Sequence, residues 1–381
     1  MSLPAHARAA FVSMDAIYLD TASNAPRLHT VDAALQAAWE AGREPWRLAW
    51  DDWEASIERV RFQVSRLFHA DLRADAGGVA LVPSVAHAMS MVAMNWPLRA
   101  GDAVGIVEGE FPSALLPWQA RCAATGARIV AVDRRDATAG FLDHLQRGDM
   151  SLLVLSEAHW RDGRRLDLER VAMAARDAGA PLVLDLSQSL GVLPCDVARW
   201  QPAFAMSVGY KWWLAGKGLC GLWMAPEWRE RAQPLEQHWQ GRAPAQPWRF
   251  DVDAPPPYRH GARRFDGGEI ADPLRLAIAG AGLAQVLDWT PAAIAARLGM
   301  LLARLRAHLD AAALGDWCVS PSSPHLLGIA PPPARVAALR ASLDAAGVAC
   351  IERDGVFRLA PHLHVDEADI DRVAEAIIAA R

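Results

Sequence analysis

The feature that most restricts the fold of this chain is a regular alternation of short apolar runs with longer amphipathic runs between residues 77 and 187. The strand candidates are GGVALVPS, AVGIVEGE, ARIVAVD, MSLLVLSE and APLVLDLS; the helix candidates are SVAHAMSMVAMNW, SALLPWQARCAATG and DLERVAMAARDAG. Strands that alternate with helices form βαβ units. The sequence therefore predicts an α/β fold with a mostly parallel central sheet covered on both faces, and ligands bind such sheets at the carboxyl ends of the strands.

The last third of the chain has a different pattern. The stretch PLEQHWQGRAPAQPWRFDVDAPPPYRHG, rich in Pro and Trp, predicts a long surface excursion. Helical runs follow at 273–289 and 291–314, then the strand SPHLLGIA, a helix, the strands GVACIER and DGVFRLAPH, and a last helix at 366–381. A chain of 381 residues exceeds the usual size of a single core. We therefore expect an N-terminal segment at 1–25, a large α/β domain at 26–265 and a smaller C-terminal α+β domain at 266–381.

Charge and composition restrict the class of partner. The formal net charge of −5 offers no basic face for nucleic acid and no polybasic segment for a membrane, so we expect a small-molecule substrate. The chain shows neither a signal-like N-terminus nor a long apolar stretch, which predicts a cytoplasmic protein. The five cysteines form no CxxC pair, and simple alternation explains the pair His362 and His364 without a metal. No GxGxxG motif follows a strand, which argues against a nicotinamide-dependent dehydrogenase.

Lysine is almost absent from the chain. Among 39 basic residues, Lys211 and Lys217 are the only lysines, and both lie in SVGYKWWLAGKG. Arginine serves as well for solubility and ion pairs, but only lysine offers a primary amine that can lose its proton and attack a carbonyl. A general bias toward arginine would also leave a few accidental lysines, so the count alone does not decide. The commonest carbonyl partner that a protein keeps permanently is pyridoxal phosphate.

Three strand ends could hold that cofactor. Asp185 closes APLVLDLS, and a carboxylate at a buried strand end is costly unless it is paired with a cation such as a protonated pyridine nitrogen; the alternative is that it caps the next turn. The helix start at Val85 and Ala86 offers unpaired N–H groups to a phosphate, although every βα turn does the same. Gln188 could bind the ring oxygen, and Phe111 could stack on the ring or simply be a core residue.

Together these motifs resemble the class-V aminotransferase family of fold-type-I pyridoxal-phosphate enzymes, which includes cysteine desulfurases, kynureninases and isopenicillin N epimerase-like proteins. YLDTASNAP is similar to the N-terminal segment of that family, LVPSVAHAMSMVA to its phosphate-loop helix, EFPSALLPW to its ring-stacking segment and SVGYKWW to its lysine segment. SEAHWRDGRRLD and VLDLSQSLG resemble the segments with ring contacts; GARRFDGGE and FRLAPHLHVDEADID resemble the dimer-facing loop and the C-terminal arginine strand. The resemblance spans nearly the whole chain and implies a fold-type-I PLP-dependent transferase, with pyridoxal 5'-phosphate as cofactor, in a homodimer with its sites at the subunit boundary.

The resemblance gives four residues a role around the cofactor ring. Lys211 would hold pyridoxal phosphate as a Schiff base and shuttle the proton at the substrate α-carbon. Asp185 would pair with the pyridinium, Gln188 would contact the ring hydroxyl, and Phe111 would stack on the ring. The reaction implied is Schiff-base exchange with an α-amino acid, with transamination as the default outcome.

The resemblance also assigns the phosphate and the substrate. Tyr210 and the backbone of Val85 and Ala86 would hold the phosphate. Arg358, in the apolar strand VFRLAP, would clamp the substrate α-carboxylate, which an arginine fork binds well. Trp160 would replace a polar contact to the ring hydroxyl and make the substrate pocket more apolar.

Two departures from the family bear on the reaction. Cys350 is separated from Arg358 only by IERDGVF, which leaves no room for the cysteine loop of a desulfurase. EFPS, HWRDGR and GYKWW are closer to kynureninases, but Ala114 stands where those enzymes carry an aspartate. A lyase with kynureninase-like C–C or C–S cleavage, an amino-acid epimerase and a non-catalytic protein of the same fold remain alternatives.

Two further departures concern the loops. Glu269 stands where many relatives place a threonine that reaches the partner's phosphate. Because a carboxylate would repel a phosphate, we expect Glu269 to point elsewhere or to contact Arg263 or Arg264. Lys217, between two glycines, is expected to be a solvated loop residue, and the segment PLEQHWQGR could line the pocket.

Overall fold

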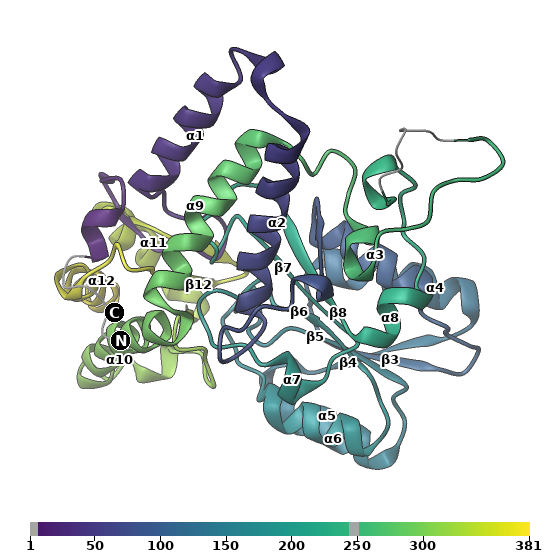
Figure 1. The fold of residues 1–381 in the computed structure, drawn as a ribbon. Helices are drawn as coiled ribbons and strands as arrows, with labels where there is room; N and C mark the ends of the chain where they lie inside the picture. Colours follow the sequence, from purple (N-terminus) through teal and green to yellow (C-terminus); the bar gives the residue numbers. More distant parts are fainter. Residues whose placement is uncertain (1–6, 244–250) are drawn as a thin grey trace.

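A computed structural model describes residues 7–243 and 251–381 of the chain, so part of the excursion expected after residue 233 lies outside the described residues. Its largest sheet has the strand order β2-β8-β7-β6-β5-β3-β4 (Figure 1). The bounds are β2 Val79–Val82, β3 Ala103–Val107, β4 Arg128–Val132, β5 Leu152–Leu155, β6 Leu182–Asp185, β7 Phe204–Val208 and β8 Cys220–Met224. Strands β4, β3, β5, β6 and β7 are parallel, and β8 is antiparallel to both of its neighbours. The predicted α/β fold with a mostly parallel sheet is confirmed.

Burial along the strands shows how the sheet is covered. Every residue of β2, β3, β5, β6, β7 and β8 is buried, and only the edge strand β4 is partly exposed. Since successive side chains of a strand point to opposite faces, complete burial means that both faces are covered. The helices of this part are α1 His29–Ala41, α2 Trp50–Leu67, α3 Val85–Asn95, α4 Pro112–Thr125, α5 Ala137–Arg147, α6 Leu168–Asp177, α7 Val197–Trp200 and α8 Pro226–Arg231.

The C-terminal elements form a separate small sheet with its helices, which gather on the side of the molecule away from β3 and β4 (Figure 1). The elements are α9 Pro273–Trp289, α10 Pro291–Ala311, β9 Leu327–Ile329, α11 Val336–Ala345, β10 Val348–Ala349, β11 Ile351–Arg353, β12 Val356–Leu359 and α12 Glu367–Ala379. β12 lies between β11 and β9, whereas β10 pairs with the N-terminal strand β1 Ile17–Tyr18. The run GVACIER, predicted as one strand, is therefore split between two sheets.

Proline and capping residues set the two long helices where the sequence predicts them. Asp272 accepts hydrogen bonds from the N–H groups of Leu274 and Arg275, and Pro273 occupies the first turn of α9. Thr290 caps α10 in the same way, with Pro291 after it. A capping oxygen satisfies N–H groups that have no partner inside the helix, and proline needs none there.

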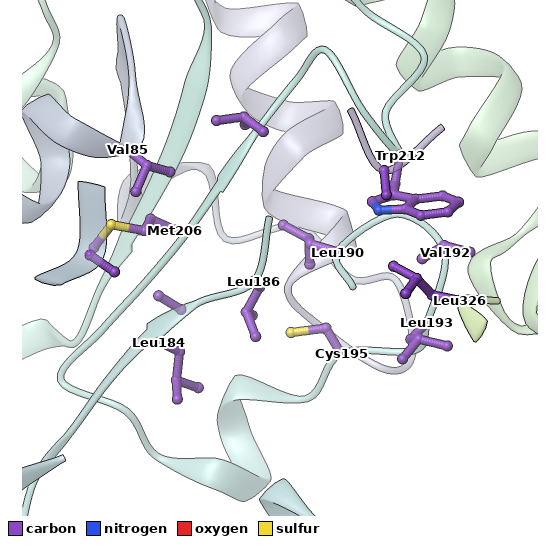
Figure 2. Packing of buried hydrophobic residues seen from close by; sticks show 14 of the residues in the cluster. Val85, Leu184, Leu186, Leu190, Val192, Leu193, Cys195, Met206, Trp212 and Leu326 are labelled. Carbon is purple, nitrogen blue, oxygen red and sulfur yellow. The ribbon is translucent and has the colours of Figure 1, made fainter. Parts of the chain in front are cut away.

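The turn after β6 is held by apolar packing. Leu186, Leu190 and Leu193 point into a cluster that also contains Cys195 and Trp212 (Figure 2). These leucines are almost fully buried, so the residues between them, which include Gln188, are fixed in place. The turn therefore gives a rigid support to the polar side chains at the end of β6.

Among the described residues, no single helix is both long and apolar enough to cross a membrane. The helices α9 and α10 meet that criterion only as a pair, and the pair is bent by 73° between them.

Candidate active site

A cavity of about 250 Å³ opens at the carboxyl ends of the central strands. Eight of the predicted site residues line it, namely Val85, Ala86, Phe111, Trp160, Asp185, Gln188, Tyr210 and Lys211. These residues come from five segments spread over more than 120 positions of the chain, and the parallel sheet brings them together at one edge. Arg358 is not part of this lining.

Lys211 follows β7 and reaches into the cavity. The residue is 7 % exposed, and burial lowers the pKa of its amine to about 8, against the opposing charge of Asp185. Its Nζ lies 5.7 Å from the centre of the Phe111 ring and 5.6 Å from that of Tyr210. An amine with a pKa near neutrality is one that can act as a nucleophile and as a base.

Asp185 is a buried carboxylate at the end of β6. The backbone N–H of Ser187 donates to its Oδ1 at 3.0 Å. Burial raises the pKa of Asp185, and the Ser187 hydrogen bonds and the charge of Lys211 lower it by less. The capping role, which was the alternative for Asp185, is thus present, but the Ser187 hydrogen bonds and the charge of Lys211 do not offset the cost of burying the carboxylate.

Gln188 is held in one orientation by both ends of its amide. Its Nε2 donates to the carbonyl oxygen of Ala22 at 3.0 Å, and its Oε1 accepts from Nε1 of Trp212 at 3.1 Å. Its own carbonyl oxygen accepts from Nε2 of His325 at 2.6 Å. One N–H of the side-chain amide remains for a ligand in the cavity.

The start of α3 forms another wall of the cavity. Ser84 is the N-cap, and its Oγ accepts from the N–H of His87 at 3.1 Å. Val85 and Ala86 occupy the first two helical positions, where N–H groups have no partner within the helix. An anion bound there meets free donors and the positive end of the helix dipole.

The aromatic wall consists of Phe111 and Trp160. Phe111 is 36 % exposed, so it is a cavity residue and not part of the core. The two rings meet edge to face, with centroids 5.3 Å apart. Nε1 of Trp160 donates to the carbonyl oxygen of Gly109 at 2.8 Å, which turns its polar edge away from the ligand space and leaves apolar surface there.

Two charged residues of the cavity were not predicted. Glu110 is buried, one of its carboxylate oxygens has no hydrogen-bond partner among the described residues, and burial raises its pKa. The motif EGEFPS, at a strand end, could have indicated it. Lys217, predicted as a solvated loop residue, is exposed but also lines the cavity, with Nζ 5.7 Å from the centre of the Tyr210 ring. The prediction for Lys217 was therefore incomplete, because the glycine-flanked turn folds back over Tyr210.

Arg358, on β12, is buried beside the N-terminal segment. Its Nη2 donates to Oδ1 of Asp20 and to Oγ of Ser23, each at 2.6 Å, and its Nη1 donates to the carbonyl oxygen of Trp160. The charges of both Arg358 and Asp20 affect the pKa of Lys211. Arg358 thus lies near the amine, although its fork is already engaged.

Several departures noted in the sequence are explained by their surroundings. Cys350 sits between β10 and β11, and burial raises the pKa of its thiol to about 12, so the thiolate nucleophile of a desulfurase does not form there. The side chain of Glu269 is exposed and points elsewhere, which is the first of the two alternatives expected for it. The second alternative does not hold, because Arg263 pairs with Glu58 and Arg264 lies 3.6 Å from Glu230. Residues 234–242 do not line the cavity.

Residues 17–243 match the family model described as aminotransferase class-V. The chain belongs to the class-V aminotransferase family. The resemblance seen in the sequence is therefore confirmed, as are the enzyme class and the pyridoxal-phosphate cofactor of this family. The alternative of a non-catalytic protein is set aside.

The chain is also similar to curated relatives in sequence and to a solved structure in fold. The chain is 26 % identical to the uncharacterized aminotransferase YcbU of Bacillus subtilis over 335 residues, which cover 86 % of this chain and 85 % of that protein. It is 29 % identical to a kynureninase of Deinococcus radiodurans over 277 residues, covering 68 % and 63 %. The fold is similar to that of an apo cysteine desulfurase from Thermococcus onnurineus, with a TM-score of 0.83, 17 % identity and coverage of 98 % and 97 %.

The residues of the cavity fit pyridoxal phosphate. Lys211 and Ser187 compensate the buried Asp185 carboxylate only in part, and a protonated ring nitrogen would supply further positive charge. The first N–H groups of α3, at Val85 and Ala86, lie at the same cavity. The amine of Lys211 lies over Phe111, on the aromatic wall. An acid, an anion-binding helix start, an aromatic face and an amine are the four features that this cofactor requires.

Proposed function

We propose that this enzyme uses Lys211 to act on an α-amino acid, with transamination as its reaction. The observation on which the proposal rests is the buried amine of Lys211, whose pKa burial lowers to about 8, in one cavity with the incompletely compensated carboxylate of Asp185. The overall similarity to the aminotransferase YcbU, over most of both chains, supports the choice of reaction.

Each residue around the cofactor would have its own role in the reaction. Pyridoxal phosphate, when bound, supplies an aldehyde for amines and a ring that takes up electrons released at the substrate α-carbon. Lys211 would hold the cofactor and then move the proton at that carbon, for which an amine titrating near neutrality is suited. Asp185 would keep the ring nitrogen protonated, Gln188 would donate to the ring hydroxyl, and Phe111 would support the ring face.

The phosphate and the substrate would be bound at the edges of the cavity. The N–H groups of Val85 and Ala86, with Tyr210 beside them, would hold the phosphate. Trp160 would form an apolar side of the substrate space, and Arg358 would bind the α-carboxylate.

A kynureninase-like lyase is the second candidate, and the similarity to the Deinococcus radiodurans kynureninase favours it. Ala114 is 1 % exposed in α4 and packs in the core, so nothing at that position takes the place of the kynureninase aspartate. This makes C–C cleavage less well supported than transamination. Epimerisation would use the same base and remains open.

The test is spectroscopic and chemical. The purified protein, loaded with pyridoxal phosphate, should show the visible absorbance of a lysine-bound cofactor, and this absorbance should change when amino acids are added. Mass spectrometry of the products then separates a keto acid from a cleaved side chain or an epimer. Absence of the band, or a band that no amino acid alters, would contradict the proposal.

We also propose a cytoplasmic homodimer with the domain division 1–25, 26–265 and 266–381. Trp39, which is 65 % accessible, lines a mostly apolar hollow of about 620 Å³ between α1, α2 and α9, a surface suited to a second copy. The free cysteines fit a reducing compartment. Sedimentation of the purified protein tests the dimer.

A further inference from the structure

The hydrogen bonds of Arg358 leave no complete fork for a substrate. Both N–H groups of Nη2 are used, one by Asp20 and one by Ser23, and Nη1 donates to the carbonyl oxygen of Trp160. A guanidinium grips a carboxylate with two parallel N–H groups, and each of its two gripping edges includes Nη2. A substrate carboxylate can therefore be held in the bidentate way only if Asp20 or Ser23 gives up its place.

The Asp20 carboxylate is the group on Arg358 that has the same charge and shape as a substrate carboxylate. Its backbone is fixed, because the carbonyl oxygen of Asp20 accepts from the N–H groups of Ser23 and Asn24, and because the residue bridges to Ala360. Among the described residues, however, the side chain has polar contacts only with Arg358. A turn of the side chain breaks that one ion pair and no other hydrogen bond.

The position of this pair connects it to the reaction site. Trp160, whose carbonyl oxygen binds Arg358, lines the cavity with its indole ring. Asp20 and Arg358 both lie close enough to Lys211 to affect its amine, in opposite directions. A carboxylate bound to Arg358 would thus lie behind Trp160, at the edge of the cavity that contains the Lys211 amine.

We propose that Asp20 occupies the carboxylate-binding position of Arg358 in the substrate-free enzyme and that the α-carboxylate of an amino acid displaces it. This inference rests on the proposed function, since it assumes that the substrate is an α-amino acid. Asp20 then weakens the binding of every carboxylate and helps to expel the acidic product. It is a specificity-determining residue that lowers the preference of the site for amino acids over simple amines.

Asp20 could instead orient Arg358 for the substrate, and this role predicts the opposite change in carboxylate binding when Asp20 is replaced. If Asp20 only orients Arg358, its loss weakens carboxylate binding. If it competes with the substrate, replacement by Asn keeps an acceptor for Nη2 but removes the competing charge, and carboxylates bind more tightly. The measurement is the carboxylate preference, defined as the dissociation constant of ethylamine divided by that of L-alanine, obtained from the absorbance change of the holoenzyme.

We expect the Asp20→Asn variant to raise the carboxylate preference by about fivefold or more, because a charge-assisted competitor is replaced by a neutral one. Ser23→Ala, which frees the other N–H of Nη2 without a change of charge, should raise it by less, about twofold. The control is Asp354→Asn: Asp354 pairs with Arg161 at 2.9 Å beside the same Trp160 and is 70 % exposed, so its loss should leave the preference unchanged.

Each outcome is decisive. A preference that falls or stays constant in Asp20→Asn, in a holoenzyme whose band responds to amino acids, overturns the role of Asp20. Should Asp20→Asn fail to fold, an unchanged preference in Ser23→Ala overturns it equally. A wild-type protein without the band contradicts the proposed function itself, and this separates the two failures.

Discussion

Two of the places that bury charged groups differ in how those charges are compensated. Arg61 on α2 is 0 % exposed, and its guanidinium forms two hydrogen bonds to the Asp266 carboxylate, at 2.8 and 2.7 Å. It also donates to the carbonyl oxygen of Val79 and to Glu58, each at 2.9 Å, while Asp266 accepts from the N–H of Leu81. In the cavity, by contrast, Asp185 and Glu110 are buried with little opposing charge.

This difference distinguishes buried charges that stabilise the fold from buried charges that bind a ligand. A buried charge whose donors and acceptors are all satisfied holds elements together, here α2, β2 and the loop before α9. A buried charge left without a partner costs stability and is retained where a ligand completes it. Substitutions in the two places should therefore change different quantities: stability at Arg61, and function at Lys211 and Asp185.

The largest effect is expected at Lys211. Lys211→Ala should lower the turnover of amino acids by at least about 10⁴-fold, because it removes both the covalent attachment and the base. Steady-state kinetics measure the loss. The other lysine is the matched control: after borohydride reduction, peptide mass mapping should find the cofactor on the peptide with Lys211, also in Lys217→Ala. Attachment at Lys217 would break the distinction between the two amines.

At Arg61 the expected loss is of stability. Arg61→Ala leaves Asp266 buried without its partner, which should lower the free energy of unfolding by about 3–5 kcal/mol. Arg263→Ala is the control, because Arg263 binds the same Glu58 at 2.6 Å but is 28 % exposed, and should cost about 1 kcal/mol. Urea denaturation compares them. Equal losses of the free energy of unfolding in the two variants would mean that the burial of Arg61 and Asp266 does not increase the cost of breaking their ion pair.

These long-range pairs mark the limit of what the sequence could predict. Position 61 lies in ERVRFQV, where nothing distinguishes the buried Arg61 from the exposed Arg59, and its partner Asp266 is 205 residues away. The engagement of Arg358 by Asp20, 338 residues apart, was equally hidden. The first contact depends on how α2 packs against the loop before α9, and the second on how the small sheet packs against the N-terminal segment; no local pattern encodes either.

The strand ends, in contrast, could be predicted. The parallel sheet follows from the alternation of apolar and amphipathic runs, and a parallel sheet brings Val85, Phe111, Asp185 and Lys211 to one edge whatever their separation. The antiparallel strand β8 was not predicted, because CGLWM has no amphipathic helix before it. The residues of the cavity were therefore more predictable than the details of the sheet.

At Asp185 function should change without a loss of stability. Asp185→Asn should lower turnover by about 100-fold, since a neutral amide does not keep a ring nitrogen protonated, and it should leave the free energy of unfolding of the apoenzyme unchanged or slightly higher. Asp266→Asn, which removes a charge from the compensated Arg61 network, should instead lower the free energy of unfolding. A marked destabilisation by Asp185→Asn would show that its charge is compensated within the protein.

The smallest effect concerns the pH dependence of stability. Burial lowers the pKa of Lys211 from 10.5 to about 8, so between these values the unfolded chain binds more protons at this site than the folded one. Stability contributed by this site therefore rises with pH across that window, and the cost of burying the charged amine is present in full below about pH 8.

A comparison of the wild-type apoenzyme with Lys211→Met isolates the contribution of Lys211 to the pH dependence of stability, because other groups that titrate in the same range are common to both proteins. Relative to the variant, the free energy of unfolding should rise between about pH 8 and 10.5 with a slope of at most about 1.4 kcal/mol per pH unit. A flat difference curve would mean that solvent or a neighbour compensates the amine. Lys211 would then resemble Arg61, and the contrast between the two regions would fail at the residue on which the chemistry depends.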